Sequence, residues 1–222
     1  MNFLAHAWTL GPEAPPEVVL GVALPDLAGV HDRRAPRVAL EVASRFEEEG
    51  APLLARGVRA HHAADSCFHE LPAFKEECSA IRGELAKLPL ESVRGFFLAH
   101  LLLEVLLDAA LLEGDPTLVT RFYEAIETSP REKAARLVSS KDAPGLERWI
   151  DRFLRARFLN DYATDEGLVF RVEQVLNRAR QTLGEEGGRR LRGALGPLRE
   201  RVRARTAALT AEPRAAVQRV LG

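Results

Sequence analysis

Apolar residues recur along most of this chain at intervals of three and four positions, which is the repeat of an α-helix. Strand-like alternation is not evident, and neither Asn-Gly nor Asp-Gly occurs as a hairpin signal. The pattern predicts an all-α fold, a compact multi-helix bundle. The expected helices cover residues 2–8, 15–24, 36–50, 53–69, 72–87 and 92–113, two shorter segments that begin at Pro116 and Pro130, and residues 146–159 and 166–183.

Proline and glycine mark the expected helix ends. Proline suits the first turn of a helix and disrupts its interior, so Pro25 is expected to end the second helix. Three glycines between residues 184 and 188 predict a hinge. We therefore expect residues 1–184 to form one main helical domain and residues 185–222 to form an Arg-rich helical appendage.

Composition fits a soluble globular chain, with 222 residues, 46% apolar and 28% charged. No apolar run reaches the roughly 18 residues of a membrane span. The longest candidate, residues 96–112, is interrupted by His100, Glu104 and Asp108. The start lacks the basic segment of a signal peptide, and two cysteines cannot form a disulfide framework. We expect a cytoplasmic protein.

Charge is unevenly placed, although the formal net charge is only -1 and gives no indication of nucleic acid as a partner. From Arg178 to the end there are eleven arginines and four glutamates, an excess of seven positive charges. Such a segment suits docking to an acidic partner. The alternative is the exposed arginine face of a terminal helix.

The candidate chemistry lies in histidines and carboxylates. The sequence contains no GxSxG, GxxxxGK[ST] or GxGxxG motif, which excludes the commonest nucleophile and phosphate-loop signatures. It contains six histidines. Histidine and carboxylate together suit Mn, Fe, Zn or Mg.

Two segments place such residues at helical spacing. His61, Asp65 and His69 are four positions apart, so on a helix they share one face. That face is either a metal site or a solvated polar stripe.

His100, Glu104 and Asp108 repeat this spacing within an almost wholly apolar segment. Buried carboxylates must be paired or bind a metal, so a polar pocket is favoured over ion pairs with arginines or one exposed stripe. Asp26 and His6 lie in apolar surroundings and are individually weak signals.

Several of these residues lie in short motifs whose order along the chain is similar to that of a known protein family. The chain opens Met-Asn-Phe-Leu-Ala-His, and residues 57–72 contain Gly-x-x-x-His-x-x-x-Asp with a later Leu-Pro pair. Over residues 1–180 the chain resembles the acyl carrier protein phosphodiesterases, a non-standard branch of the HD phosphohydrolases. Further matches are the Gly-x-x-x-x-Asp stretch that ends at Asp26, His100 in Ala-His-Leu-Leu, and the segment that begins Asp161-Tyr162.

The resemblance implies an HD-phosphohydrolase-like fold and hydrolysis of the phosphodiester between 4′-phosphopantetheine and a serine of holo acyl carrier protein. It also implies that a divalent ion is bound, with Mn²⁺ favoured over Fe²⁺ or Zn²⁺. Acyl carrier proteins are acidic, which would suit the basic C-terminal segment. The implied metal ligands are His6, Asp26, His61, Asp65 and His100, and the implied catalytic residues are Asp65, His69 and Glu104. His62 is a further candidate for metal ligand, general base or phosphate contact, and Arg59 or Arg94 is a candidate for holding the phosphate.

The chain also departs from the family pattern. Ala99 replaces an aspartate, His69 replaces an acid, and the basic and aromatic residues expected after His100 are absent. These departures leave two alternatives open. One is a phosphoesterase for another small phosphoester or a phospholipid, and the other is a non-catalytic helical binding protein that keeps the fold.

Overall fold

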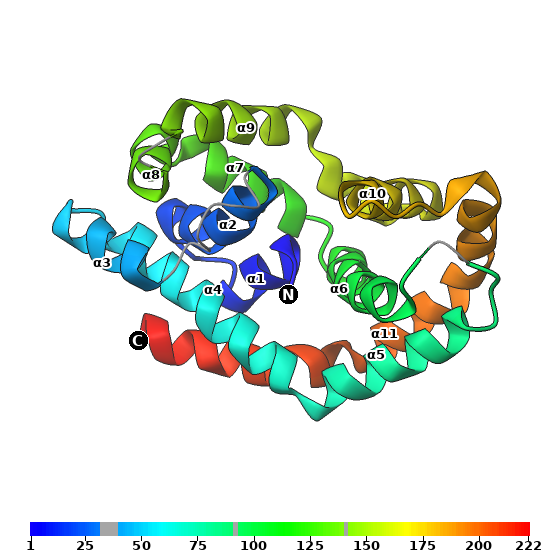
Figure 1. The fold of residues 1–222 in the computed structure, drawn as a ribbon. Helices are drawn as coiled ribbons and strands as arrows, with labels where there is room; N and C mark the ends of the chain where they lie inside the picture. The colour runs from blue at the N-terminus through cyan, green and yellow to red at the C-terminus, as the bar shows by residue number, and fades with distance from the viewer. Residues whose placement is uncertain (32–39, 91–92, 140–141) are drawn as a thin grey trace.

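The computed structural model describes residues 1–31, 40–90, 93–139 and 142–222. These residues form eleven α-helices, one 3-10 helix and no strand, which confirms the prediction of an all-α bundle (Figure 1). The expected helix starts at Pro36 and Ser92 lie outside the described residues. The helices are α1 Phe3–Leu10, α2 Pro16–His31, α3 Leu40–Glu48, α4 Pro52–Glu70, α5 Pro72–Leu85, α6 Gly95–Gly114, α7 Leu118–Thr128, α8 Arg131–Val138, α9 Ala143–Ala156, η1 Phe158–Ala163, α10 Asp165–Arg178 and α11 Gly184–Leu221.

Two glycines let α2 and α4 cross with their backbones in contact. A Cβ added to Gly21 would lie 2.4 Å from the Leu54 carbonyl oxygen, and one added to Gly57 would lie 2.3 Å from that of Val18. Neither position has room for a side chain. The close crossing brings the last turns of α2 within reach of the polar face of α4.

The prediction that helix α2 ends before Pro25 is wrong. The helix continues through Pro25 to His31. Proline removes one helical hydrogen bond. The helix is buried on most of its surface, with Leu24, Leu27 and Ala28 inside the core, so packing outweighs this loss. Asp26 consequently lies within a helix and not in a turn beyond one.

Helix α6 is long and apolar enough to cross a membrane, judged by length and composition alone, yet most of it is buried inside the bundle. It packs against α5, α11 and α1. Asp108, buried on α6, accepts hydrogen bonds from the backbone N–H groups of Leu4 and Ala5, at 3.1 and 2.7 Å. Asn2, the N-cap residue of α1, makes no capping bond with its side chain, so Asp108 caps α1 from another helix.

The C-terminal residues, expected as an appendage, form helix α11, which passes along α6 and α5 and reaches α4 (Figure 1). Its apolar face joins the main core through Leu191, Leu195, Leu198, Val202, Leu209 and Val217. The glycines at 187 and 188 lie inside this helix, where no hinge interrupts it. Helix α11 is therefore an integral part of the bundle.

Many arginines of α11 pair with carboxylates of the same molecule. Arg201 and Arg205 both contact Glu77, which is buried, and Arg199 bonds Asp165 at 2.7 Å. Arg189, Arg190, Arg192 and Arg203 also contact glutamates. Much of the positive charge of this segment is thus directed at the protein's own acidic surface.

Candidate metal centre

Helices α1, α2 and α4 bring His6, Asp26 and His61 together. One ligand atom from each lies within 4.8 Å of the others, and we call these three residues the buried triad. The rings of His6 and His61 stack with their centroids 4.1 Å apart. The crossing at Gly21 and Gly57 positions His61, whose Nδ1–H donates to the Val22 carbonyl at 2.9 Å.

The buried triad has polar atoms without hydrogen-bond partners. Both ring nitrogens of His6 and the Oδ2 atom of Asp26 are buried and unsatisfied within the described part of the chain. The carbonyl of Val22 holds the proton of His61 on Nδ1 and leaves a lone pair on Nε2. Such a hydrogen bond behind the ring is typical of metal-binding histidines. Unsatisfied buried polar atoms are costly, so this donor set fits a cation.

Burial sets the protonation states of the buried triad. It lowers the pKa of His6 well below its ordinary value and that of His61 to about 4, so both imidazoles are neutral at pH 7. Burial raises the pKa of Asp26 to about 8. Asp26 is only half-buried as a residue, but its Oδ2 atom is enclosed within the protein.

His69, His100 and Glu104 form a second group, which we call the outer triad. Its members come from α4 and α6, and their ligand atoms also lie within 4.8 Å of one another. His100 Nε2 lies 3.1 Å from Glu104 Oε1 and 3.3 Å from His69 Nε2. In contrast to the buried triad, these residues are partly exposed and hydrogen-bond one another.

Asp65 lies between the two triads. Its Oδ1 atom is 3.9 Å from His6 Nε2, and its Oδ2 atom is 3.5 Å from His69 Nδ1. The α-ammonium group of Met1 also lies here, 2.7 Å from Asp65 Oδ1 and 3.0 Å from Glu104 Oε1. A positive group is therefore accommodated directly between these carboxylates.

These contacts shift the pKa values around Asp65 strongly. Burial alone would raise the pKa of Asp65, but His69 and the Met1 ammonium hold it well below its usual range. Burial would likewise raise the pKa of Glu104, which Met1, His100 and His69 keep well below normal. Hydrogen bonds to Asp65 and Glu104 raise the pKa of His69 to about 9. At pH 7 both carboxylates are ionised and His69 is an imidazolium.

The structure distributes the residues expected in one site over two triads. His6, Asp26 and His61 meet in the buried triad, Asp65 contacts both, and His69, His100 and Glu104 meet in the outer triad. The other three expected contacts lie as follows: the ring of His62 is edge-on to His61, Arg59 pairs with Glu47, and Arg94 lies over the ring of Phe97.

Sequence reasoning missed the Val22 carbonyl and the role of Asp108 as a helix cap. Burial raises the pKa of Asp108 to about 7, against the lowering effect of the N–H groups of Leu4 and Ala5. The signal that could have indicated the position of the Val22 carbonyl was the pair Gly21 and Gly57. Two glycines within apolar helices favour a close helix crossing.

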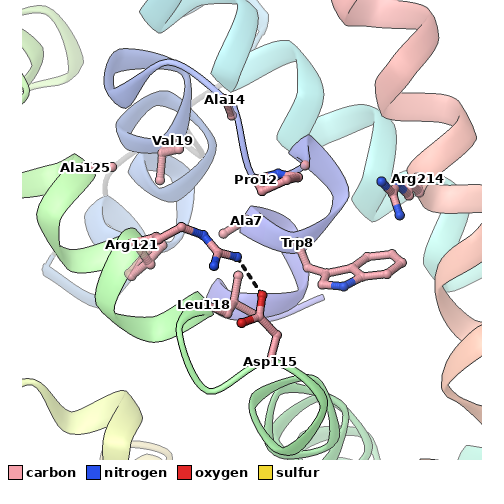
Figure 2. A pocket seen from close by; sticks show the side chains of 12 residues that line it. Ala7, Trp8, Pro12, Ala14, Val19, Asp115, Leu118, Arg121, Ala125 and Arg214 are labelled. Carbon is pink, nitrogen blue, oxygen red and sulfur yellow. Dashed lines mark hydrogen bonds and ion pairs between the residues drawn. The ribbon is translucent and has the colours of Figure 1, made fainter.

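A cavity of about 160 Å³ lies elsewhere, between α1, α2 and α7 (Figure 2). Its charged residues include Asp115 and Arg121, which neutralise each other in a 2.7 Å ion pair. Trp8 also lines it, beneath the guanidinium of Arg214. No member of either triad belongs to its described lining, so this cavity is not part of the candidate centre.

Comparison with protein-family models, with curated proteins and with solved structures finds no match for this chain.

Proposed function

We propose that this chain is a metal-dependent phosphodiester hydrolase. The ion is held by His6, Asp26 and His61, with Asp65 as a further ligand. The donor set of two neutral imidazoles and carboxylates suits Mn²⁺, with Fe²⁺ and Zn²⁺ as alternatives. One observation carries this proposal: the buried triad presents unsatisfied nitrogen and oxygen atoms to a common point.

The residues around the centre suit phosphoryl chemistry. A divalent ion supplies Lewis acidity when bound, which lowers the pKa of water and neutralises charge on phosphate oxygens. Asp65 stays ionised and joins the two triads. Glu104 stays ionised too, and it holds the imidazoles of His69 and His100 within hydrogen-bond reach.

His69 is assigned as the proton donor. Its raised pKa keeps it protonated at neutral pH, and it is partly exposed at the edge of the cluster. When a phosphodiester is hydrolysed, one ester oxygen departs as an alkoxide, and it must take up a proton as its bond to phosphorus breaks. The imidazolium also stabilises negative charge that develops on the phosphate oxygens.

The carrier-protein substrate is supported by the sequence resemblance alone. We propose release of 4′-phosphopantetheine from holo acyl carrier protein as the first reaction to test. Docking through the C-terminal basic segment is less favoured than the sequence suggested, because α11 directs many of its arginines at the body of the protein.

The test combines metal analysis with a defined substrate. Purified protein is loaded with Mn²⁺, analysed for metal content, and incubated with holo acyl carrier protein while released phosphopantetheine is measured. We expect about one equivalent of metal and release that Asp26→Asn abolishes. The exposed Glu84→Gln variant is the matched control, and its activity should stay unchanged. Metal without release would reject this substrate; no bound metal would favour a binding protein and reject the hydrolase.

A further inference from the structure

A second cavity, of about 290 Å³, lies beside the outer triad. Its walls come mainly from α1, α6, α9, η1 and α10, and Glu104 forms part of them. It does not overlap the cavity of Figure 2, with which it shares no lining residue. Neither the buried triad nor the proposed proton donor His69 is part of its described lining.

Three phenylalanines and aliphatic side chains make one side of this cavity apolar. Phe3, Phe153 and Phe158 form a ring cluster, with centroids 5.2 Å apart for Phe3–Phe153 and for Phe153–Phe158. Leu101 and Val105 of α6 extend this surface. An aliphatic or aromatic body would bury apolar surface against this side of the cavity.

The polar side of the cavity carries three arginines and one carboxylate, Glu104, which is paired with the Met1 ammonium group. The guanidinium of Arg152 lies 5.6 Å from the centre of the Trp149 ring, and that of Arg178 lies 5.8 Å from it. Arg171, a third arginine of the lining, is paired with Asp161. Among the described residues Arg152 contacts no carboxylate, and the indole N–H of Trp149 is buried without an acceptor. A ligand with a negatively charged acceptor would satisfy both.

We propose that this cavity binds an amphiphilic anion, a molecule with an aliphatic or aromatic body and a phosphate or carboxylate head. The body lies against Phe3, Phe153 and Phe158, and the head faces Arg152 and the Trp149 indole. The inference follows from the apolar walls, from Arg152, which contacts no carboxylate among the described residues, and from the indole N–H of Trp149. It does not depend on hydrolytic activity, and it holds for the protein with or without metal.

Calorimetric titration of the full-length protein with decyl phosphate, below its micelle concentration, tests the proposal. Glycerol 3-phosphate carries the head without the body, and decyltrimethylammonium carries the body with the opposite charge. We expect decyl phosphate to bind at least about tenfold more tightly than either, about 1.4 kcal/mol. Equal binding of the glycerol ester would overturn the apolar part, and equal binding of the ammonium compound would overturn the anionic part. Decanoate in place of decyl phosphate identifies which head is preferred; binding of either supports the proposal.

Variants locate the binding. Arg152→Gln should lower the affinity for decyl phosphate about tenfold. Arg155→Gln, a change at an exposed position of the same helix outside the lining, should leave the affinity unchanged. Ala156→Phe, at an exposed position of the lining, should block binding. Ala211→Phe, at an exposed position of α11, should leave binding intact. Unchanged affinity in both Arg152→Gln and Ala156→Phe would overturn the assignment to this cavity.

The two tryptophans provide a second readout. Decyl phosphate should change the fluorescence of the Trp8→Phe variant, in which Trp149 is the only indole, and leave that of Trp149→Phe unchanged. The reverse pattern would place the ligand in the cavity beside Trp8 and contradict the proposal.

Discussion

The buried and outer triads each contain two histidines and one carboxylate, and they differ in how their polar atoms are satisfied. In the outer triad His69, His100 and Glu104 hydrogen-bond one another and are partly exposed. In the buried triad His6 has no partner for either nitrogen, and Asp26 has none for Oδ2. A group that is already hydrogen-bonded has little need for a ligand, whereas a buried unsatisfied one gains considerably from binding.

On the basis of this difference we propose different roles for the two triads. Under the proposed function the buried triad would hold the cation, because its imidazoles are neutral and the ring of His61 is oriented by Val22. The outer triad carries a proton at neutral pH on His69 and is accessible from outside. Metal binding is thus expected in the interior and proton transfer at the surface.

The largest expected effect is the loss of metal from the buried triad. His61→Ala should lower Mn²⁺ affinity by about 100-fold or more, because it removes a ligand from a site with few others. His100→Ala, the matched change in the outer triad, should retain the ion. Elemental analysis and calorimetric titration measure both. Equal loss in the two variants would show that the triads form one shared centre.

Substitution of the proton donor should affect turnover without affecting metal content. His69→Gln should lower phosphodiester hydrolysis about 100-fold with alkyl leaving groups. With bis(4-nitrophenyl) phosphate the loss should be far smaller, because nitrophenolate leaves without a proton. Turnover rates of both substrates at constant metal content provide the measurement. An equal loss with both leaving groups would argue against proton donation by His69.

Asp26→Asn should have effects of opposite sign with and without metal. In metal-free protein the pKa of Asp26 is raised by burial to about 8, so its contribution to stability is full at low pH and is lost as pH rises through about 8. At pH 9 the variant should therefore be more stable by about 1–3 kcal/mol, and at pH 4 it should equal the wild type. In metal-loaded protein the variant should be less stable. Urea unfolding at each pH measures this; a variant less stable in both forms at pH 9 would contradict it.

The smallest expected effect is the change in protein stability when a residue of the outer triad is replaced. His100→Ala removes hydrogen bonds between partly exposed groups, so the free energy of unfolding should fall by less than about 1 kcal/mol. His6→Ala in metal-free protein provides the comparison in the buried triad. It removes two unsatisfied nitrogens but opens a cavity. Thermal unfolding of the metal-free variants measures both, and a loss above about 3 kcal/mol for His100→Ala would mean that the outer triad is structurally essential.

Local signals predicted much of the helical framework. The expected helix over residues 53–69 is α4, Pro52–Glu70, and the proline at its start occupies the first turn. The helix expected from residue 166 begins at Asp165, and its N-cap Thr164 accepts a hydrogen bond from the Gly167 N–H at 3.1 Å. The spacing of His61, Asp65 and His69 does place them along one face of α4, because that face depends only on the helical repeat.

Signals from outside the local segment explain what was missed. Pro25 predicts a helix end by local rules, and only the burial of α2 on most of its surface overrides them. The arginines of the last segment suggested an appendage, but Arg199, Arg201 and Arg205 have carboxylate partners on α5 and α10 and at Glu113 of α6. These partners are far away in sequence, so composition alone does not reveal them.

The sequence by itself determined that the chain is helical, where most helices begin, and which histidines and carboxylates share a helix face, because these properties follow from a repeat of 3.6 residues and from proline and glycine stereochemistry. Only the tertiary structure decided that these residues divide into two triads and which of them is left without partners. That division depends on the contact of α2 with α4 at Gly21 and Gly57, and on Asp108 of α6 as the cap of α1. Both are contacts between distant segments, and burial, which sets the protonation of each group, arises only when those segments pack.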